Sequence, residues 1–230
     1  MKLKLLHLLI AFLIGLLWSQ PALAVLIDWT DWTSATAGAS GSATGTIAGG
    51  ITVTYSGDVT FAQLGLGTNY WAEFIPPPYT GNSVVDDAPP AAEMVALSLS
   101  GITNTHTFSS PVVDPIMAIV SLGQPLVPVS YDFDSPFTVL GTGIGYWNVV
   151  TGFAGSYAVS PGDILTGNEF HGVIQFNGTF SSISWTASPA EFWHGITVGL
   201  PPAAVPEPST LLLLGPGLVG LAALRRKFTQ

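Results

Sequence analysis

Between its two ends the chain alternates apolar and polar residues with a period of two, which is typical of half-buried β-strands. The alternation is clearest at residues 51–55 and 129–134. Mainly apolar segments at 94–99, 116–122 and 192–198 are further strand candidates. No stretch of this middle region has a helical period with capping residues, so the pattern predicts an all-β domain.

Turn signals separate the predicted strands. Asn177 and Gly178 lie between two of them, and Asn-Gly predicts a β-hairpin because both residues tolerate positive φ. Residues 34–50 are nearly all Gly, Ala, Ser and Thr and are expected to form a flexible loop, while prolines interrupt 76–78 and 86–90. Many short strands with Gly/Pro turns and no fixed-period repeat predict an antiparallel two-sheet sandwich, jelly-roll-like in type.

The N-terminal end has the three parts of a secretory signal peptide. Lys2 and Lys4 precede an apolar run at residues 5–18, and Ala22 and Ala24 then give the small-x-small pattern that signal peptidase cleaves. We expect cleavage after Ala24. The alternative is a membrane anchor, but the run is short for a membrane span.

The C-terminal end has a second apolar run, residues 211–224, followed by Arg225, Arg226 and Lys227. As a helix this run would reach about 21 Å, against a hydrocarbon core of about 30 Å. The basic triplet keeps the C-terminus on the cytoplasmic side, because positive residues flanking a span remain inside. The N-terminal lysines do the same for the other end, so the region between is expected to be exported.

Residues 205–210 read Val-Pro-Glu-Pro-Ser-Thr and stand directly before that short apolar run. Motif, short transmembrane helix and basic end, in this order, resemble the PEP-CTERM sorting tail, with Pro206, Glu207 and Pro208 as its name-giving triplet. The resemblance implies processing by exosortase, a transient stay in the inner membrane, and delivery to the surface or matrix of a Gram-negative bacterium that makes exopolysaccharide. The alternative is a Pro-rich linker before a simple tail anchor.

The chain thus divides into a signal peptide at 1–24, a β-sandwich ectodomain at 25–204 and a sorting tail at 205–230. From residue 25 to residue 205 there is no Lys or Arg, although this region holds all but one of the 14 acidic residues. Nucleic-acid binding is excluded, because it depends on Lys and Arg contacts to phosphate. The chain has no cysteine, so disulfides cannot stabilise the ectodomain.

Two acid–imidazole pairs are candidates for an enzyme site. Glu169 and His171 are two residues apart, and Glu191 and His194 are three apart. Together the four could form a metal or acid/base site, which leaves a hydrolase as one alternative. Local hydrogen bonding at turns explains the pairs equally well, and the common catalytic motifs are missing. We therefore expect a non-enzymatic domain with no catalytic residues and no cofactor.

The sequence leaves two binding alternatives open. Structural calcium is a possibility at Asp132 and Asp134 or at Asp86 and Asp87, although the wet face of a strand explains the first pair equally well. A carbohydrate-binding module is the second, because aromatic planes can stack on the sugar rings of exopolysaccharide. Among the tryptophans of the ectodomain, Trp29 and Trp32 are predicted to be the most exposed pair, because they lie near the N-terminus left by signal-peptide cleavage.

The label "ice-binding protein C-terminal" is also used for this tail family. Thr103, Thr105 and Thr107 could present one row of threonines, but one row is not the array that such a surface needs. The sequence therefore predicts a non-enzymatic β-sandwich at the cell surface or in the extracellular or biofilm matrix.

Overall fold

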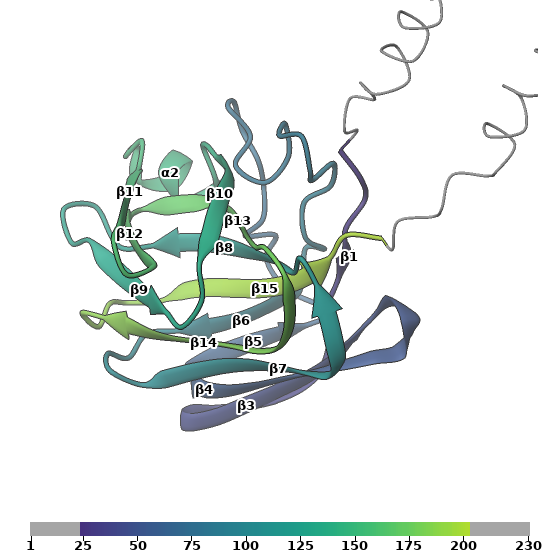
Figure 1. The fold of residues 1–230 in the computed structure, drawn as a ribbon. Coiled ribbons are helices and arrows are strands. Elements are labelled where there is room, and N and C mark those ends of the chain that lie inside the picture. Colours follow the sequence, from purple (N-terminus) through teal and green to yellow (C-terminus); the bar gives the residue numbers. More distant parts are fainter. Residues whose placement is uncertain (1–23, 203–230) are drawn as a thin grey trace, which may run out of the picture.

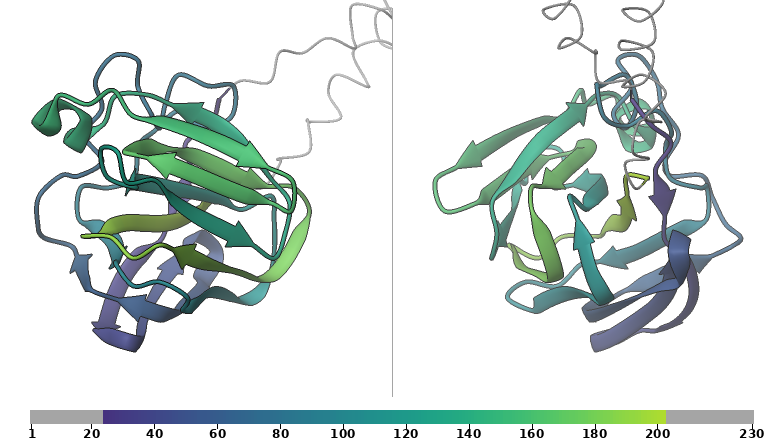
Figure 2. Two further views of the ribbon diagram at one scale, coloured as in Figure 1. Left: turned by 90° about the vertical axis from the view of Figure 1, so that its left-hand side faces the viewer. Right: turned by 45° about the vertical axis from the view of Figure 1, so that its right-hand side comes forward.

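The computed structural model describes residues 24–202, which form two antiparallel β-sheets stacked as a sandwich (Figures 1 and 2). The predictions for Ala22 and for the tail from residue 205 onward lie outside the described residues. Within those residues, no helix is long and apolar enough to cross a membrane. The predicted all-β, antiparallel two-sheet sandwich is confirmed.

The seven-stranded sheet contains, in spatial order, β10 (Phe137–Thr142), β13 (Phe170–Phe176), β8 (Ile116–Leu122), β15 (His194–Leu200), β6 (Glu93–Leu97) and β5 (Phe61–Leu64), while β1 (Asp28–Trp29) pairs with β15. The eight-stranded sheet contains β11 (Ser156–Ser160), β12 (Ile164–Asn168), β9 (Val129–Phe133), β14 (Thr179–Ser188), β7 (Thr103–Val113), β4 (Ile51–Val59), β3 (Gly38–Ile47) and β2 (Asp31–Thr36). A 3₁₀ turn η1 (Ala48–Gly50) and a short helix α2 (Tyr146–Thr151) complete the elements.

The central strands pair in a nested order. β6 pairs with β15, β7 with β14, β8 with β13 and β9 with β12. The strands β6, β7, β8 and β9 alternate between the two sheets, so the chain crosses from one sheet to the other at each connection between them. This is one long antiparallel hairpin rolled into two sheets, which is the jelly-roll arrangement. The remaining strands extend its edges.

Burial on both faces explains why the seven-stranded sheet has continuous apolar segments. One face packs against the other sheet in the main core. The opposite face, with Met94, Ala118 and Val173, is covered by the long loop between β5 and β6 through Trp71 and Tyr79. A strand buried on both sides has no solvent face on which to place polar residues.

The eight-stranded sheet keeps the alternating pattern, because its outer face is uncovered. Where β3, β4, β7 and β14 pair with one another, their outward positions hold hydroxyl residues, and cross-strand pairs join these into rows. The rows are Thr44–Thr54–Thr107–Ser182 and Ser42–Ser56–Thr105–Ser184, with Thr46–Thr52 and Thr103–Thr186 at the two ends. The expectation of one isolated threonine row is therefore wrong, because strands distant in sequence place their hydroxyls in register.

The expected flexible loop at 34–50 is also wrong, since these residues form the second half of β2 and all of β3. Their small side chains serve close packing instead. A Cβ added at Gly41 would lie 2.6 Å from the carbonyl oxygen of Thr36, and one at Gly45 would lie 2.5 Å from that of Asp31. Gly, Ala and Ser indicate here a tight strand pair rather than mobility.

The predicted hairpin at Asn177 and Gly178 is a connection between sheets. It joins β13 of one sheet to β14 of the other, and only Gly178 has positive φ. The nearby β7–β8 connection crosses at the same corner through Asp114. The Asp114 carboxylate accepts the Gly178 N–H at 2.7 Å, and the Asp114 N–H donates to the Gly178 carbonyl at 2.8 Å.

Candidate functional site

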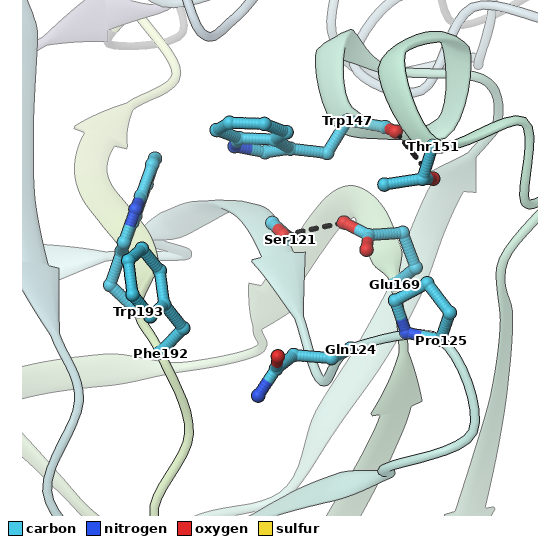
Figure 3. Close-up of a pocket in the computed structure, with 8 residues that line it drawn as sticks. All are labelled: Ser121, Gln124, Pro125, Trp147, Thr151, Glu169, Phe192 and Trp193. Atoms are coloured by element: carbon cyan, nitrogen blue, oxygen red, sulfur yellow. Dashed lines mark hydrogen bonds between the residues drawn. The ribbon is translucent and has the colours of Figure 1, made fainter.

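A pocket of about 200 Å³ lies beside the C-terminal end of β8, where the chain leaves the seven-stranded sheet (Figure 3). Four segments line it: the end of β8 and its following turn, the residue before β13, helix α2, and the segment before β15. Their side chains are Ser121, Gln124, Pro125, Trp147, Thr151, Glu169, Phe192 and Trp193.

The polar part of the pocket is the contact between Ser121 and Glu169. The Ser121 hydroxyl donates to Glu169 Oε1 at 2.5 Å, and both residues are buried. Each also has positive φ, 61° for Ser121 and 58° for Glu169, which few non-glycine residues adopt. These irregular backbone positions interrupt the strand alternation and bring both side chains into the pocket.

Asn148 connects helix α2 to this polar part. Its side-chain amide donates to the backbone carbonyls of Glu169 and Phe153, each at 3.0 Å, and its Oδ1 accepts the Gly145 N–H at 2.8 Å. The neighbouring Trp147 and Thr151 therefore reach the pocket from a helix that is fixed to the residue at its base. Because the Asn148 side chain is buried, these bonds are shielded from water.

Aromatic side chains form the walls. The rings of Trp147 and Trp193 stand nearly perpendicular, at 75° with centroids 5.9 Å apart. Tyr70 supports both from behind, stacked on Trp147 at 17° and edge-on to Trp193 at 67°. Phe192, at the mouth, is 80% exposed. The walls of the pocket are therefore mainly aromatic, and the pocket opens to solvent beside Phe192.

His171 lies behind the pocket and does not line it. Its Nδ1 is 3.2 Å from the Tyr79 hydroxyl, and its Nε2 is 3.6 Å from Glu169 Oε1. Burial lowers the pKa of His171 below its usual value, although Glu169 opposes this effect. A Cβ on Gly145 would meet the His171 ring at 2.2 Å, so the approach of α2 to this imidazole requires glycine.

The second acid–imidazole pair is hydrogen-bonded to the turn that follows β8, and neither of its residues lines the pocket. His194 Nδ1 is 2.5 Å from Glu191 Oε1, and the same oxygen accepts the Gly123 N–H at 3.0 Å. The His194 ring packs on Tyr131, a residue of the main core. Of the four residues in the hydrolase hypothesis, only Glu169 lines the pocket. The two pairs are therefore not brought together in this pocket, and the hydrolase alternative stays a prediction.

Trp29 and Trp32 are not an exposed pair, which corrects the predicted sugar-stacking site. Trp32 lies in the main core, stacked on His106 with centroids 6.0 Å apart, and its Nε1–H donates to Thr197. Trp29 packs in the second core against the outer face of the seven-stranded sheet. Nearness to a new N-terminus did not imply exposure, because β1 and β2 are integral strands.

The aromatic residues of the pocket, the half-buried Trp147 and Trp193 and the exposed Phe192, were not predicted as a site. Trp147 follows a glycine-rich segment, and Phe192 and Trp193 fall within the predicted strand 192–198, although β15 begins only at His194. An exposed aromatic residue in a broken strand pattern is the one signal that could have indicated the pocket. Ser121 is the one polar residue in the apolar run 116–122, and a lone serine in a strand does not by itself indicate a pocket.

The calcium candidates remain a prediction. Asp132 and Asp134 line a shallow depression on the eight-stranded sheet together with Thr103 and Thr186. Asp87 accepts the Ile27 N–H at 2.6 Å. Nowhere in residues 24–202 do three His, Asp or Glu side chains come together in a group that could hold a metal ion.

Comparison with known proteins identifies the tail. No curated protein and no solved structure matches the chain. The model of the PEP-CTERM protein-sorting motif matches residues 204–227, which contain Pro206, Glu207, Pro208 and the basic triplet. The predicted sorting tail is thereby confirmed: the chain carries a PEP-CTERM protein-sorting motif and is an exported protein targeted to exosortase.

Proposed function

We propose that the ectodomain is a non-enzymatic carbohydrate-binding domain, held at the cell surface or in the extracellular matrix after exosortase processing. The observation that carries the proposal is the pocket between Trp147 and Trp193. Sugar rings have apolar faces that pack on aromatic planes and hydroxyl rims that need polar partners. The two tryptophans supply the planes, while Gln124, Ser121 and Glu169 supply the polar groups.

The residues of the pocket favour binding over hydrolysis. Glycoside hydrolysis generally uses two carboxyl groups on either side of the scissile bond, about 5–9.5 Å apart. Glu169 is the single titratable residue in the pocket lining, and His171 lies behind it with its Nδ1 near Tyr79. A second acid would have to come from the ligand or from a rearrangement of the site.

The size of the pocket sets the length of ligand that it holds. Its volume of about 200 Å³ is below the range of about 300–1,000 Å³ that drug-sized ligands occupy. It accommodates one sugar ring rather than an extended oligosaccharide. A domain that holds single rings of a polymer serves for attachment to a matrix, where many weak contacts act together.

Retention of the full chain, purified in mild detergent, on a gel of exopolysaccharide tests the proposal. Phe192→Ala removes an exposed ring at the mouth, and Gln124→Ala removes an amide from the lining, so both are expected to lower retention with little loss of stability. Leu66→Ala is the matched control, because Leu66 is also exposed but lies outside the pocket. Equal retention of all four proteins would contradict the assignment of the pocket. Release of shorter sugars from the gel would contradict a non-enzymatic role.

A further inference from the structure

Most buried carboxylates of this domain accept hydrogen bonds from the backbone. Asp58 Oδ2 accepts the N–H groups of Ser98 and Leu99, both at 2.6 Å. Glu93 Oε2 accepts the Trp32 N–H at 2.6 Å. In a region without Lys or Arg, fixed N–H groups take the place of cations. These carboxylates are thereby committed to holding loops and strands together.

Glu169 differs from them. Its hydrogen-bond donor is the Ser121 hydroxyl, which can rotate towards another acceptor, and no hydrogen bond to its second oxygen, Oε2, is found within residues 24–202. Its carboxylate also lines the pocket between Trp147 and Trp193, and neither Asp58 nor Glu93 is part of that lining. Figure 3 shows this carboxylate facing Ser121, with Trp147 and Trp193 around the same space.

No basic group neutralises Glu169. The nearest one is the His171 imidazole, with Nε2 at 3.6 Å, and burial lowers the pKa of that histidine so that it is neutral near pH 7. The rest of the described chain contains no Lys or Arg. A buried carboxylate without a cation is costly, which favours a ligand that supplies the positive charge.

The walls of the pocket suit the same kind of ligand. The face of an indole ring attracts cations, and tryptophan does so more strongly than tyrosine or phenylalanine. We propose that the pocket selects an amino sugar with a free, protonated amine, an inference that rests on the proposed sugar-binding function. The ammonium group lies between Trp147, Trp193 and the Glu169 carboxylate, and donates to that carboxylate.

The chemistry separates this ligand from two close relatives. N-acetylation of the sugar removes the positive charge and adds bulk, so a pocket of about 200 Å³ disfavours it. A quaternary ammonium group, as in a choline headgroup, keeps the charge for the tryptophans but has no N–H to donate to Glu169. The free amine satisfies both the aromatic walls and the acid.

Titration of the full chain in mild detergent tests the inference, with tryptophan fluorescence as the signal and the pH held below the pKa of the amine. The ligands are glucosamine oligomers, the same oligomers N-acetylated, glucose oligomers and choline. Glu169→Gln removes the charge while keeping the shape of the side chain. Asp132→Asn is the control, because Asp132 is exposed on the other sheet and its loss changes the net charge equally.

We expect glucosamine oligomers to bind most tightly. Glu169→Gln should weaken them by about tenfold or more, as loss of a hydrogen bond between charged groups implies, while Asp132→Asn changes little. Equal binding of the free and acetylated oligomers, unaffected by Glu169→Gln, would overturn the amine inference and leave sugar binding intact. Tightest binding of choline would overturn the amino sugar as the ligand. Binding of no ligand, with near-ultraviolet circular dichroism of a folded protein, would overturn the proposed function itself.

Discussion

His106 makes the stability of the main core dependent on pH. It lies on β7, fully buried among the rings of Trp32, Tyr55 and Trp185, and neither ring nitrogen has a hydrogen-bond partner in residues 24–202. Burial lowers the pKa of His106 from 6.5 to about 3. A proton therefore binds the unfolded chain more readily than the folded one across this interval.

The direction and size of the effect follow from that shift. The folded-state pKa is depressed, so the stability that neutral His106 allows is present above about pH 6.5 and is lost as the pH falls towards 3. Each unit of the interval costs about 1.4 kcal/mol of unfolding free energy. At about pH 5 the loss is about 2 kcal/mol. This is a large fraction of the 5–15 kcal/mol that is typical of folded domains.

Urea unfolding at about pH 7 and about pH 5, at one ionic strength, measures the loss in the wild type. His106→Phe and His106→Gln both remove the titrating group, so each should reduce the difference between the two pH values by about 2 kcal/mol. Their absolute stabilities will differ, because phenylalanine is larger and glutamine is polar. His171 titrates in all three proteins and cancels in the comparison. Variants with the pH dependence of the wild type would refute the reasoning.

Three further predictions concern the acidic side chains. Asp58→Ala leaves the Ser98 and Leu99 N–H groups without their acceptor and should cost about 3 kcal/mol in urea unfolding; a loss below about 0.5 kcal/mol would contradict this. Because residues 25–205 contain no Lys or Arg, the thermal midpoint of unfolding should rise with NaCl, which screens the repulsion between carboxylates. A further rise with calcium at matched ionic strength would indicate a specific site, and a midpoint that changes with neither salt would contradict the prediction. Glu207→Ala should leave an uncleaved form by intact mass in the native host, whereas Thr229→Ala should be processed normally.

The sequence predicted the sandwich because each strand follows a local rule. The alternation at 129–134 and the apolar run at 116–122 correspond to β9 and β8. A local pattern also has limits, since glycine and alanine at 34–50 indicate either a loop or a strand pair without room for larger side chains. Only the position of Val59 and the strand carbonyls, which lie close to Gly41, decides between them.

The candidate site was less predictable, because its residues meet only through the nested strand pairing. Ser121 and Glu169 are 48 residues apart in sequence and adjoin because β8 pairs with β13. Their positive φ values have no signal in the sequence, since neither is Gly, Asn or Asp. The sorting motif could be predicted for the opposite reason, because its residues are contiguous in the sequence and match as one linear motif over 204–227.

Because this exported domain has no cysteine, lysine or arginine, hydrogen bonds from the backbone to carboxylates hold its loops in place of disulfides and ion pairs. The connection between β5 and β6 has no regular strand of its own, yet its Trp71 and Tyr79 pack on the outer face of the seven-stranded sheet. Glu73 fixes it internally, with Oε1 accepting the N–H groups of Tyr79 and Thr80 at 2.8 Å and Oε2 accepting the Thr80 hydroxyl at 2.9 Å. Tyr79 in turn contacts His171, directly behind Glu169. An acid bonded to the backbone therefore positions the residue that supports the pocket, and the carboxylate in the pocket is left available for a ligand.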